Sequence, residues 1–200
     1  MREHVNDFYV KSAKTRGLRS RAAFKLMEII QRDRLLAPGM LVIDLGAAPG
    51  GWSQVAAEIV GTRGKVIALD TLEMQAIAGV DFIRGDLRDP VVLKKLHDKL
   101  QGASADLVIC DISPNITGIA SHDQAQAMEL AQLAVDFSMQ VLKPQGGLLV
   151  KVFQGVGFED FLKVMRGHFK QVTTRKPKAS RGRSREIYLL GRGLRRDGQG

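Results

Sequence analysis

The chain has a single cysteine, Cys110, among its 200 residues, which excludes an internal disulfide framework and a multi-cysteine metal site. No apolar run approaches the roughly 18 residues that a membrane-spanning helix needs. The first residues contain no apolar signal-peptide core, and the four histidines have no spacing typical of metal ligands. We therefore expect a cytoplasmic protein without a metal or a membrane partner. Cys110 follows the apolar residues 107–109, so it should be a buried, inert thiol.

Two common nucleotide-binding fingerprints are also missing, although a glycine-rich turn is present. An apolar run at 41–43 leads into Asp44-Leu45-Gly46-Ala47-Ala48-Pro49-Gly50-Gly51-Trp52, and residues 53–60 have a helical pattern. This layout is typical of a nucleotide-type cofactor site, because glycine lets the backbone approach a ligand and the helix N-terminus offers free N–H groups. The turn lacks the G-x-G-x-x-G spacing of dinucleotide sites and the Lys-Ser/Thr of a P-loop. An acidic residue before the turn suits a cofactor with a cationic amino-acid end, such as S-adenosylmethionine (SAM). A tight turn without a ligand is the alternative.

Positive charge is concentrated at the two ends of the chain. Residues 1–40 carry a net charge of +5, residues 175–200 carry +7 and residues 41–174 carry −3, within a total of +9. The segment 175–185 contains six Lys or Arg residues and no acidic residue. Basic flanks beside a cofactor fold favour a polyanionic substrate, most simply nucleic acid, with 175–185 as a phosphate-contacting surface. Charge that serves only solubility is the alternative.

Strand and helix patterns alternate from about residue 40 to residue 192. The alternation predicts an α/β fold of the Rossmann-like type, with a seven-stranded, mainly parallel sheet and helices on both faces. The last two strands have only the basic loop between them, so we expect the last strand to be antiparallel, as in SAM-dependent methyltransferases. Lys143-Pro144-Gln145-Gly146-Gly147 is typical of a helix end that precedes a strand. The expected strands are 41–45, 65–69, 80–83, 106–110, 147–153, 171–174 and 186–190, and the expected helices are 20–34, 51–60, 90–100, 123–142 and 157–167.

We divide the chain into three segments on this basis. Residues 1–40 are a basic N-terminal extension with one helix, and we expect this extension to face the nucleic acid. Residues 41–192 form the SAM-dependent methyltransferase domain. Residues 193–200 are expected to be a disordered tail.

Ionisable residues stand at the ends of five expected strands: Asp44, Asp70, Asp86, Asp111 and Lys151. Ligands of open α/β sheets bind beyond the carboxyl ends of the strands. Asp70, about twenty residues after the glycine turn, is placed for the ribose hydroxyls of an adenosine, and Asp86 for its adenine amino group. A single Asp often closes a strand only by capping a turn. The set, more than any one member, therefore indicates a site.

Lys151 is the most informative of these residues, because it lies within the apolar run 148–153, which should be a buried central strand. Desolvating an ammonium is costly unless it is paired. Burial also disfavours the charged form of a lysine, which makes Lys151 a candidate base. An edge or snorkelling lysine is the alternative. Asp111-Ile112-Ser113-Pro114-Asn115 indicates a strand end entering a turn, and Glu186, at the start of the last strand, could pair with a cationic neighbour.

The order of these motifs closely resembles the FtsJ/RrmJ family of SAM-dependent ribose 2′-O-methyltransferases, and within it the bacterial members that act on large-subunit ribosomal RNA. The resemblance implies a catalytic set of Lys25, Asp111, Lys151 and Glu186, and Lys25 gains its role only in this way. It also implies SAM contacts at Gly50, Trp52, Asp70, Asp86 and Asp111. The matching stretches are residues 17–22, 44–54, 79–82, 85–86, 111–115, 150–155, 175–177 and 184–186.

The resemblance further implies 2′-O-methylation of a ribose, a uridine of 23S ribosomal RNA, within the large ribosomal subunit. We expect a monomer in which Lys151 accepts the proton of the hydroxyl or stabilises the developing alkoxide, with Asp111 orienting it. The chain departs from the family in two respects: Ser113 stands where Ala is common, and the N-terminal arm is short. Three alternatives remain: a SAM enzyme for small molecules or proteins, a non-catalytic RNA-binding module, and an NAD-type oxidoreductase, which the spacing of the turn disfavours.

Overall fold

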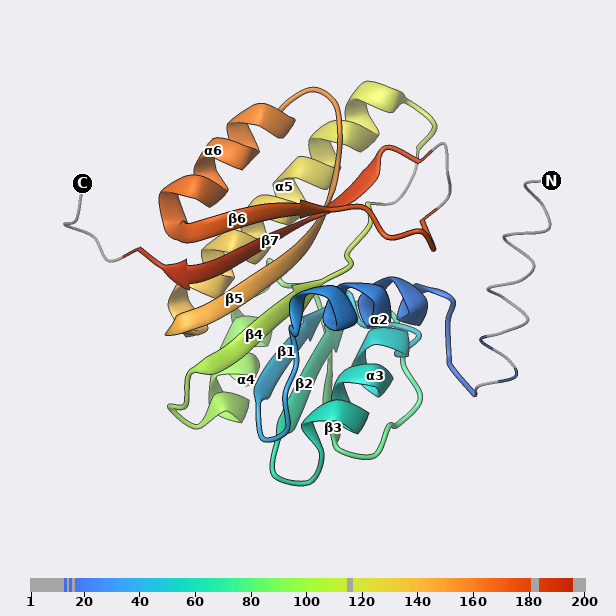
Figure 1. Ribbon diagram of the computed structural model, residues 1–200, viewed down its shortest axis with the longest axis vertical. Coiled ribbons are helices and arrows are strands. Elements are labelled where there is room, and N and C mark those ends of the chain that lie inside the picture. Colours follow the sequence, from blue (N-terminus) through green and yellow to red (C-terminus); the bar gives the residue numbers. More distant parts are fainter. Residues whose placement is uncertain (1–12, 14, 16, 115–116, 181–183, 196–200) are drawn as a thin grey trace.

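The structure is a computed structural model, and it describes residues 13, 15, 17–114, 117–180 and 184–195. Its strands form one seven-stranded sheet of order β3-β2-β1-β4-β5-β7-β6 (Figure 1). The strands are β1 (Leu41–Leu45), β2 (Lys65–Asp70), β3 (Val80–Arg84), β4 (Ala105–Cys110), β5 (Leu142–Phe153), β6 (Phe169–Arg175) and β7 (Glu186–Leu194). The helices are α2 (Ala22–Asp33), α3 (Gly51–Val60), α4 (Pro90–Leu100), α5 (Ala120–Val141) and α6 (Phe158–His168).

The strand directions agree with the predicted fold class. From β3 to β5, neighbouring strands pair in parallel, whereas β7 is antiparallel to both β5 and β6. The last strand is therefore inserted between two strands of the opposite direction. The Rossmann-like sheet, mainly parallel with an antiparallel last strand, is confirmed.

Helices cover both faces of the sheet, also as predicted. One face packs against α2 and α3, with Leu26 and Trp52 among the residues that meet Leu149 of β5. The other face packs against α4, α5 and α6. Leu148 and Val150, which flank Leu149 in β5, lie in the apolar core on this face. Successive side chains of a strand point to opposite faces, and a strand covered on both faces must be apolar in both directions. None of the helices in the described residues is long and apolar enough to cross a membrane.

The strand order reverses between β1 and β4, and this reversal sets the position of the site. After β1 the chain adds β2 and β3 on one side, and β4 then pairs with the free side of β1. The crevice at the carboxyl ends of such a strand pair is where ligands bind in open α/β sheets. The backbone N–H of Asp111, just after β4, donates to the carbonyl of Leu45 at the end of β1 (3.1 Å). The glycine turn and Asp111 are thus brought to the same point.

Two predicted boundaries are wrong. The strand expected at 147–153 is longer than predicted, because β5 begins at Leu142, directly after α5 ends, and the β4–β5 register shifts between Ala105 and Leu107. Pro144 ends the helix, and the residue before a proline favours an extended backbone. The expected tail also begins too early, because β7 runs to Leu194, which pairs with Phe169 of β6, and the N–H of Arg195 donates to the carbonyl of His168. Residues 196–200 lie outside the described part of the chain.

A half-buried ion pair holds α2 to the last two strands. Both nitrogens of the Arg175 fork donate to the carboxylate of Asp33, at 2.7 and 2.5 Å, and Arg192 donates to the Asp33 carbonyl. The hydrogen bond from Arg175 is the main reason that the pKa of Asp33 lies below its ordinary value. A bidentate arginine–carboxylate pair is geometrically specific and strong. This pair fixes the end of α2 over β6 and β7.

Replacing Asp33 with Asn is expected to lower the free energy of unfolding at pH 7 by about 1.5–3 kcal/mol, the usual value of a hydrogen bond to a charged group. The native pKa is depressed, so this stability is present above the unfolded pKa and is lost as the pH falls through the native value. Urea titrations at pH 7 and pH 3 measure both effects. The control is Asp160→Asn, which breaks an exposed pair with Lys163 and should cost less than about 0.5 kcal/mol. Equal losses in the two variants would contradict the assignment.

Candidate active site

The glycine turn after β1 allows close contact between neighbouring loops. Gly46 (φ 76°) and Gly50 (φ 105°) both have the left-handed backbone that favours glycine. A Cβ on Gly46 would lie 2.6 Å from the Ile112 side chain, and one on Gly50 would lie 2.7 Å from Ile77. Gly50 also precedes the first turn of α3, where backbone N–H groups lack intrahelical acceptors. The turn therefore has the form that the sequence predicts for a cofactor cradle.

Asp44, the acidic residue predicted at the first strand end and before the turn, is fully buried at the end of β1. The Ser53 hydroxyl donates to its Oδ2 atom (2.6 Å), whereas Oδ1 is the only buried side-chain oxygen or nitrogen in the described residues without a hydrogen-bond partner. Burial, joined by the charges of Asp111 and Asp70, raises the pKa of Asp44 to about 7 despite the hydrogen bond from Ser53, which lowers it. Three carboxylates that repel one another at a crevice form a favourable site for a cationic group.

Asp70 and Asp86 stand at successive strand ends, as expected. Asp70 accepts a hydrogen bond from the N–H of Ala48 (2.9 Å) and so joins the end of β2 to the glycine turn. Asp86 follows β3, and both of its carboxylate oxygens accept hydrogen bonds from Arg88. That hydrogen bond lowers the pKa of Asp86 below its ordinary value. Asp70 is thus part of the crevice wall, while Asp86 is engaged by Arg88.

The indole of Trp52 is directed away from the crevice. It is buried in the first turn of α3, donates its ring N–H to the carbonyl of Ala22 (2.8 Å) and packs against Tyr188 with 5.6 Å between the ring centroids. Its side chain therefore joins α3 to α2 and β7. Only the backbone of Trp52 would therefore be available for contact with a cofactor.

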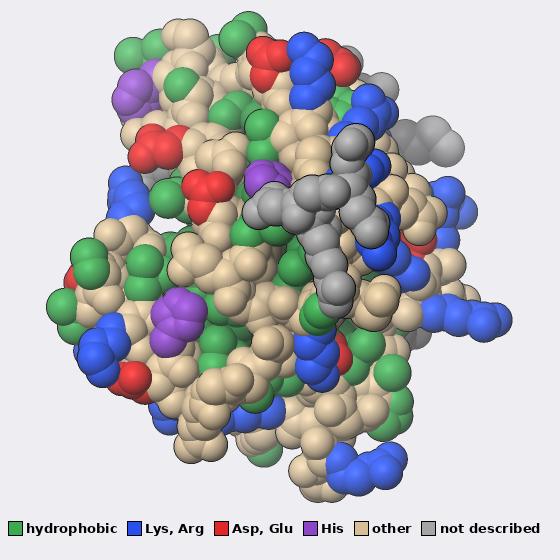
Figure 2. Space-filling view, turned by 90° about the vertical axis from the view of Figure 1, so that its left-hand side faces the viewer, with side chains coloured by type: hydrophobic (Ala, Val, Ile, Leu, Met, Phe, Trp, Pro, Cys, Tyr) green, Lys and Arg blue, Asp and Glu red, His purple; other side chains and the backbone are tan. Residues whose placement is uncertain are grey.

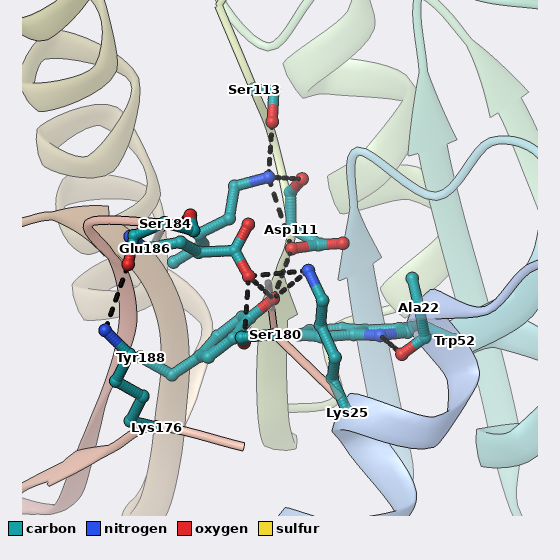
Figure 3. A network of polar contacts seen from close by, with 11 residues as sticks. Ala22, Lys25, Trp52, Asp111, Ser113, Lys176, Ser180, Ser184, Glu186 and Tyr188 are labelled. Atoms are coloured by element: carbon teal, nitrogen blue, oxygen red, sulfur yellow. Dashed lines mark hydrogen bonds and ion pairs between the residues drawn. The ribbon is translucent and has the colours of Figure 1, made fainter. Parts of the chain in front are cut away.

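The four predicted catalytic residues come together at the carboxyl edge of the sheet: Lys25, Asp111 and Glu186 lie close together in Figure 3, and the ammonium of Lys151 contacts Asp111. Register explains part of this: Cys110 of β4 pairs with Val150, which places Asp111 next to Lys151, and Lys151 lies directly opposite Tyr188 of β7. Lys151 is buried in a strand with neighbours on both sides, which rules out the alternative of an edge lysine. Cys110 is also buried, as predicted, and burial raises the pKa of its thiol to about 12.

Lys151 and Asp111 form one half of the network. The ammonium of Lys151 donates to the backbone carbonyl of Asp111 (2.7 Å), lies 3.2 Å from its Oδ1 atom and donates to the hydroxyl of Ser113. An ammonium has three N–H donors; the Asp111 carbonyl and the Ser113 hydroxyl accept from two of them, and the Asp111 carboxylate pairs with the charge. The position at which Ser113 departs from the resembled family thus touches the central lysine.

Lys25 and Glu186 form the other half. Lys25 is buried on α2, and its ammonium lies 2.5 Å from Oε1 of Glu186, the first residue of β7. Burial by itself would raise the pKa of Glu186, but the hydrogen bond and charge of Lys25, with the charge of Lys151, lower it below its ordinary value. Glu186 therefore stays ionised, and its predicted pairing with a cationic neighbour is confirmed.

The hydroxyl of Tyr188 joins the two halves, and sequence reasoning missed it. It donates to Oδ1 of Asp111 (2.9 Å), accepts from Lys25 (3.3 Å) and lies 3.3 Å from Glu186. Burial is the main cause that raises its pKa far above the ordinary value, so the phenol keeps its proton. A usable signal was present, because residues two apart in a strand face the same side, and Tyr188 follows Glu186 by two.

The predicted phosphate-contacting loop is only partly available for that role. Arg175 is turned inward to Asp33, which corrects its assignment to this surface. Lys176, Lys178 and Arg185 are exposed, whereas Arg181, Arg183 and also Asn115 of the Asp111 motif lie outside the described residues. Lys and Arg side chains gather on the right half of the face drawn in Figure 2.

A doubly wound sheet with an antiparallel β7, a glycine turn at the switch point and a buried charged network beside it defines a Rossmann-like methyltransferase. The sequence profile of the FtsJ-like methyltransferase family matches residues 18–194. The chain belongs to this family.

Named relatives cover nearly the whole chain. It is 60% identical over 195 residues to "Ribosomal RNA large subunit methyltransferase E" of Nitrosospira multiformis, which covers 98% of this chain and 95% of the relative. The Azoarcus sp. protein of the same name is 55% identical with the same coverage. A crystal structure of a candidate ribosomal RNA methyltransferase from Plasmodium falciparum has a TM-score of 0.77 at 30% identity, covering 88% of this chain and 98% of that one. A candidate methyltransferase from Streptococcus mutans, solved with SAH, shares the fold (TM-score 0.52, 16% identity, 80% and 90% covered).

The raised pKa of Asp44 predicts a pH-dependent effect of Asp44→Asn on stability in the absence of ligand. Between the unfolded pKa and about 7, the unfolded Asp44 is ionised while the native one keeps its proton, so the wild type loses stability as the pH rises. The melting temperature of Asp44→Asn, relative to that of the wild type, should therefore rise from pH 4 to pH 8. Most of this rise should have occurred by about pH 7. The control is Asp136→Asn, an exposed site on α5. If the difference in melting temperature between the variant and the wild type did not change with pH, Asp44 would be ionised in the native protein over the whole range.

Proposed function

We propose that the protein transfers the methyl group of SAM to the 2′-hydroxyl of a ribose, a uridine of 23S ribosomal RNA, in the large ribosomal subunit. The observation that carries this proposal is the buried network of Lys25, Glu186, Tyr188, Asp111 and Lys151 beside the glycine turn (Figure 3). A lysine held by carboxylate and hydroxyl groups supports the proposal, because a weakly acidic ribose hydroxyl must lose its proton in such a transfer.

The residues of the crevice fit SAM, which supplies an activated methyl group on a cationic sulfur. The unpartnered Oδ1 of Asp44 and the neighbouring carboxylates of Asp70 and Asp111 favour a ligand with positive charge. Gly46 and Gly50 let the turn pack closely against Ile112 and Ile77, which gives the crevice beside the turn its shape. Leu72 follows Asp70 by two residues, and its side chain is 66% exposed, which offers an apolar surface to a purine ring. Trp52 and Asp86 are further cofactor contacts in this proposal, Trp52 through its backbone.

Lys151 is the residue that we place against the reacting hydroxyl. In its ammonium form it stabilises the negative charge that develops on the oxygen, and in its neutral form it takes the proton. Asp111 and Ser113 hold its nitrogen in position. Lys25 and Glu186 fix the Tyr188 hydroxyl, which in turn fixes Asp111.

Ribosomal RNA is the substrate that we propose, on two grounds. The two relatives above are named as large-subunit ribosomal RNA methyltransferases, and they match almost the full length of the chain. The exposed Lys176, Lys178 and Arg185 also lie in the segment that leads into Glu186 and the network, so phosphate groups held there would be close to the site.

The reaction is tested by transfer of labelled methyl from SAM to undermethylated large ribosomal subunits, naked ribosomal RNA and transfer RNA, followed by digestion to nucleosides. We expect label in 2′-O-methyluridine from ribosomal material. Label only in transfer RNA would overturn the substrate and keep the reaction. SAM binding without any label would favour another acceptor, and label without RNA would show a small-molecule or protein methyltransferase. Titration with SAM and NAD separates these outcomes from a non-catalytic RNA-binding module and an oxidoreductase.

Lys151→Ala is expected to lower kcat by at least about 10²-fold, the usual contribution of a group that moves a proton, while leaving the Kd for SAM nearly unchanged. Strand β4 lies between β5, which carries Lys151, and β1, which leads into the glycine turn, so the cradle stays intact. Single-turnover assays at saturating SAM and RNA measure the first effect and calorimetry the second. The control is Lys143→Ala, an exposed lysine paired with Asp106. Normal turnover in Lys151→Ala would refute the assignment.

A further inference from the structure

The segment just before α2 lies across the cofactor crevice. Residues 17–22 are among the stretches that match the resembled family, yet of these residues the network uses only the carbonyl of Ala22. The carbonyl of Gly17 accepts a hydrogen bond from the Gln54 side chain (3.0 Å), and the N–H of Arg19 donates to the same amide group (3.2 Å). Gln54 belongs to α3, the helix that follows the glycine turn. The N-terminal extension is therefore docked onto the cofactor cradle by backbone contacts on both sides of Leu18.

The guanidinium of Arg19 reaches the loop on the far side of the turn. Its two terminal nitrogens donate to the carbonyls of Gln75 (2.6 Å) and Ala76 (2.7 Å), and one of them also lies 3.4 Å from the carbonyl of Pro49. Its Cδ atom would be 3.2 Å from a Cβ on Gly50. The arginine thus bridges the glycine turn and the loop of residues 71–79, which we call the cofactor loop because it follows Asp70.

Few other contacts hold the cofactor loop, and at its start Arg84 donates to the carbonyl of Thr71 (3.3 Å) and lies 3.8 Å from the carboxylate of Glu73. Residues 71–79 contain no regular helix or strand, and most of them are exposed. Met74 and Ile77 pack with Ala47 and Ala48 of the glycine turn, so the loop rests on the turn through a small apolar contact. A planar guanidinium presents a rigid fork of donors that can hold two adjacent carbonyls at once. Arg19 is therefore well suited to determine where the tip of this loop lies.

We infer that Arg19 is a positioning residue for SAM: it holds the cofactor loop against the glycine turn, so that the crevice wall is complete only when the N-terminal extension is docked. This inference rests on the proposed use of SAM. Arg19 and Lys25 belong to the same short segment, so one docking event orders both the crevice wall and the network. Affinity for the cofactor is thereby coupled to a basic extension that lies outside the sheet.

The test compares Arg19→Lys, Arg19→Gln and the control Arg32→Gln, which removes the same charge from an exposed site on α2. Lys keeps the charge of Arg19 but not the fork, so a loss in Arg19→Lys separates loop positioning from general attraction of RNA. Calorimetry without RNA should show a Kd for SAM raised about 10- to 150-fold in both Arg19 variants, for the loss of a charged hydrogen bond. Arg32→Gln should bind SAM like the wild type. In assays, the KM for SAM should rise while kcat at saturating SAM stays close to the wild-type value.

Hydrogen–deuterium exchange without SAM provides a second measurement, which does not depend on the proposed function. Amides of residues 71–79 should exchange faster in Arg19→Lys than in the wild type and in Arg32→Gln, while those of β1 and β4 are unchanged. Gln54→Ala, which loosens the extension without altering the guanidinium, should give the same exchange pattern to a smaller degree. This variant replaces the Arg19 variants if circular dichroism shows that they do not fold. Wild-type exchange in the loop together with a wild-type Kd for SAM would overturn the inference. If the wild type binds no SAM, the proposed function fails, and the exchange data alone decide whether Arg19 holds the loop.

Discussion

Two lysines and two carboxylates are buried together at the carboxyl edge of the sheet, and their mutual neutralisation constrains the rest of the molecule. A buried charge is tolerated when it is paired and hydrogen-bonded, and removing one partner leaves the other uncompensated. The Lys25–Glu186 pair joins α2 to β7, and the Lys151–Asp111 pair joins β5 to the end of β4. Tyr188 connects the pairs through its hydroxyl. The extension, the centre of the sheet and the last strand are therefore required in one arrangement.

A different electrostatic situation exists one strand away. Asp44, Asp70 and Asp111 face a common crevice, and no cation in the described residues neutralises the free oxygen of Asp44. Such an arrangement costs stability in the absence of a ligand, and functional sites often retain a cost of this kind. Asp111 belongs to both groups, since it pairs with Lys151 and also raises the pKa of Asp44. The charge of a positively charged ligand in the crevice would therefore act on Asp111 and, through it, on Lys151.

The N-terminal extension is a structural part of the site, although it precedes the sheet in the chain. Its far end is held by Asp33 against Arg175 and Arg192 of the last two strands, and its near end by Arg19 against the loops of the crevice. Lys25 lies between these two attachments. This explains how a segment that sequence patterns present as a separate basic arm brings Lys25 into contact with Glu186 and Tyr188 at the edge of the sheet. Membership of the FtsJ-like methyltransferase family agrees with this arrangement, because the matching region begins at residue 18, ahead of α2.

The sequence by itself determined the fold class, the order of strands and helices and the cofactor turn, because these depend on local apolar periodicity and on glycine and proline positions. Lys151 was also predictable as a buried residue, since a lone lysine in an apolar run must be paired. Tertiary structure alone decided that Tyr188 joins the network, that Arg175 turns to Asp33 instead of to solvent, and that Arg19 holds the cofactor loop. Each of these contacts joins residues at least 56 positions apart in the chain. Contacts of this range depend on strand register and on which helix covers which face of the sheet, and a local pattern contains neither.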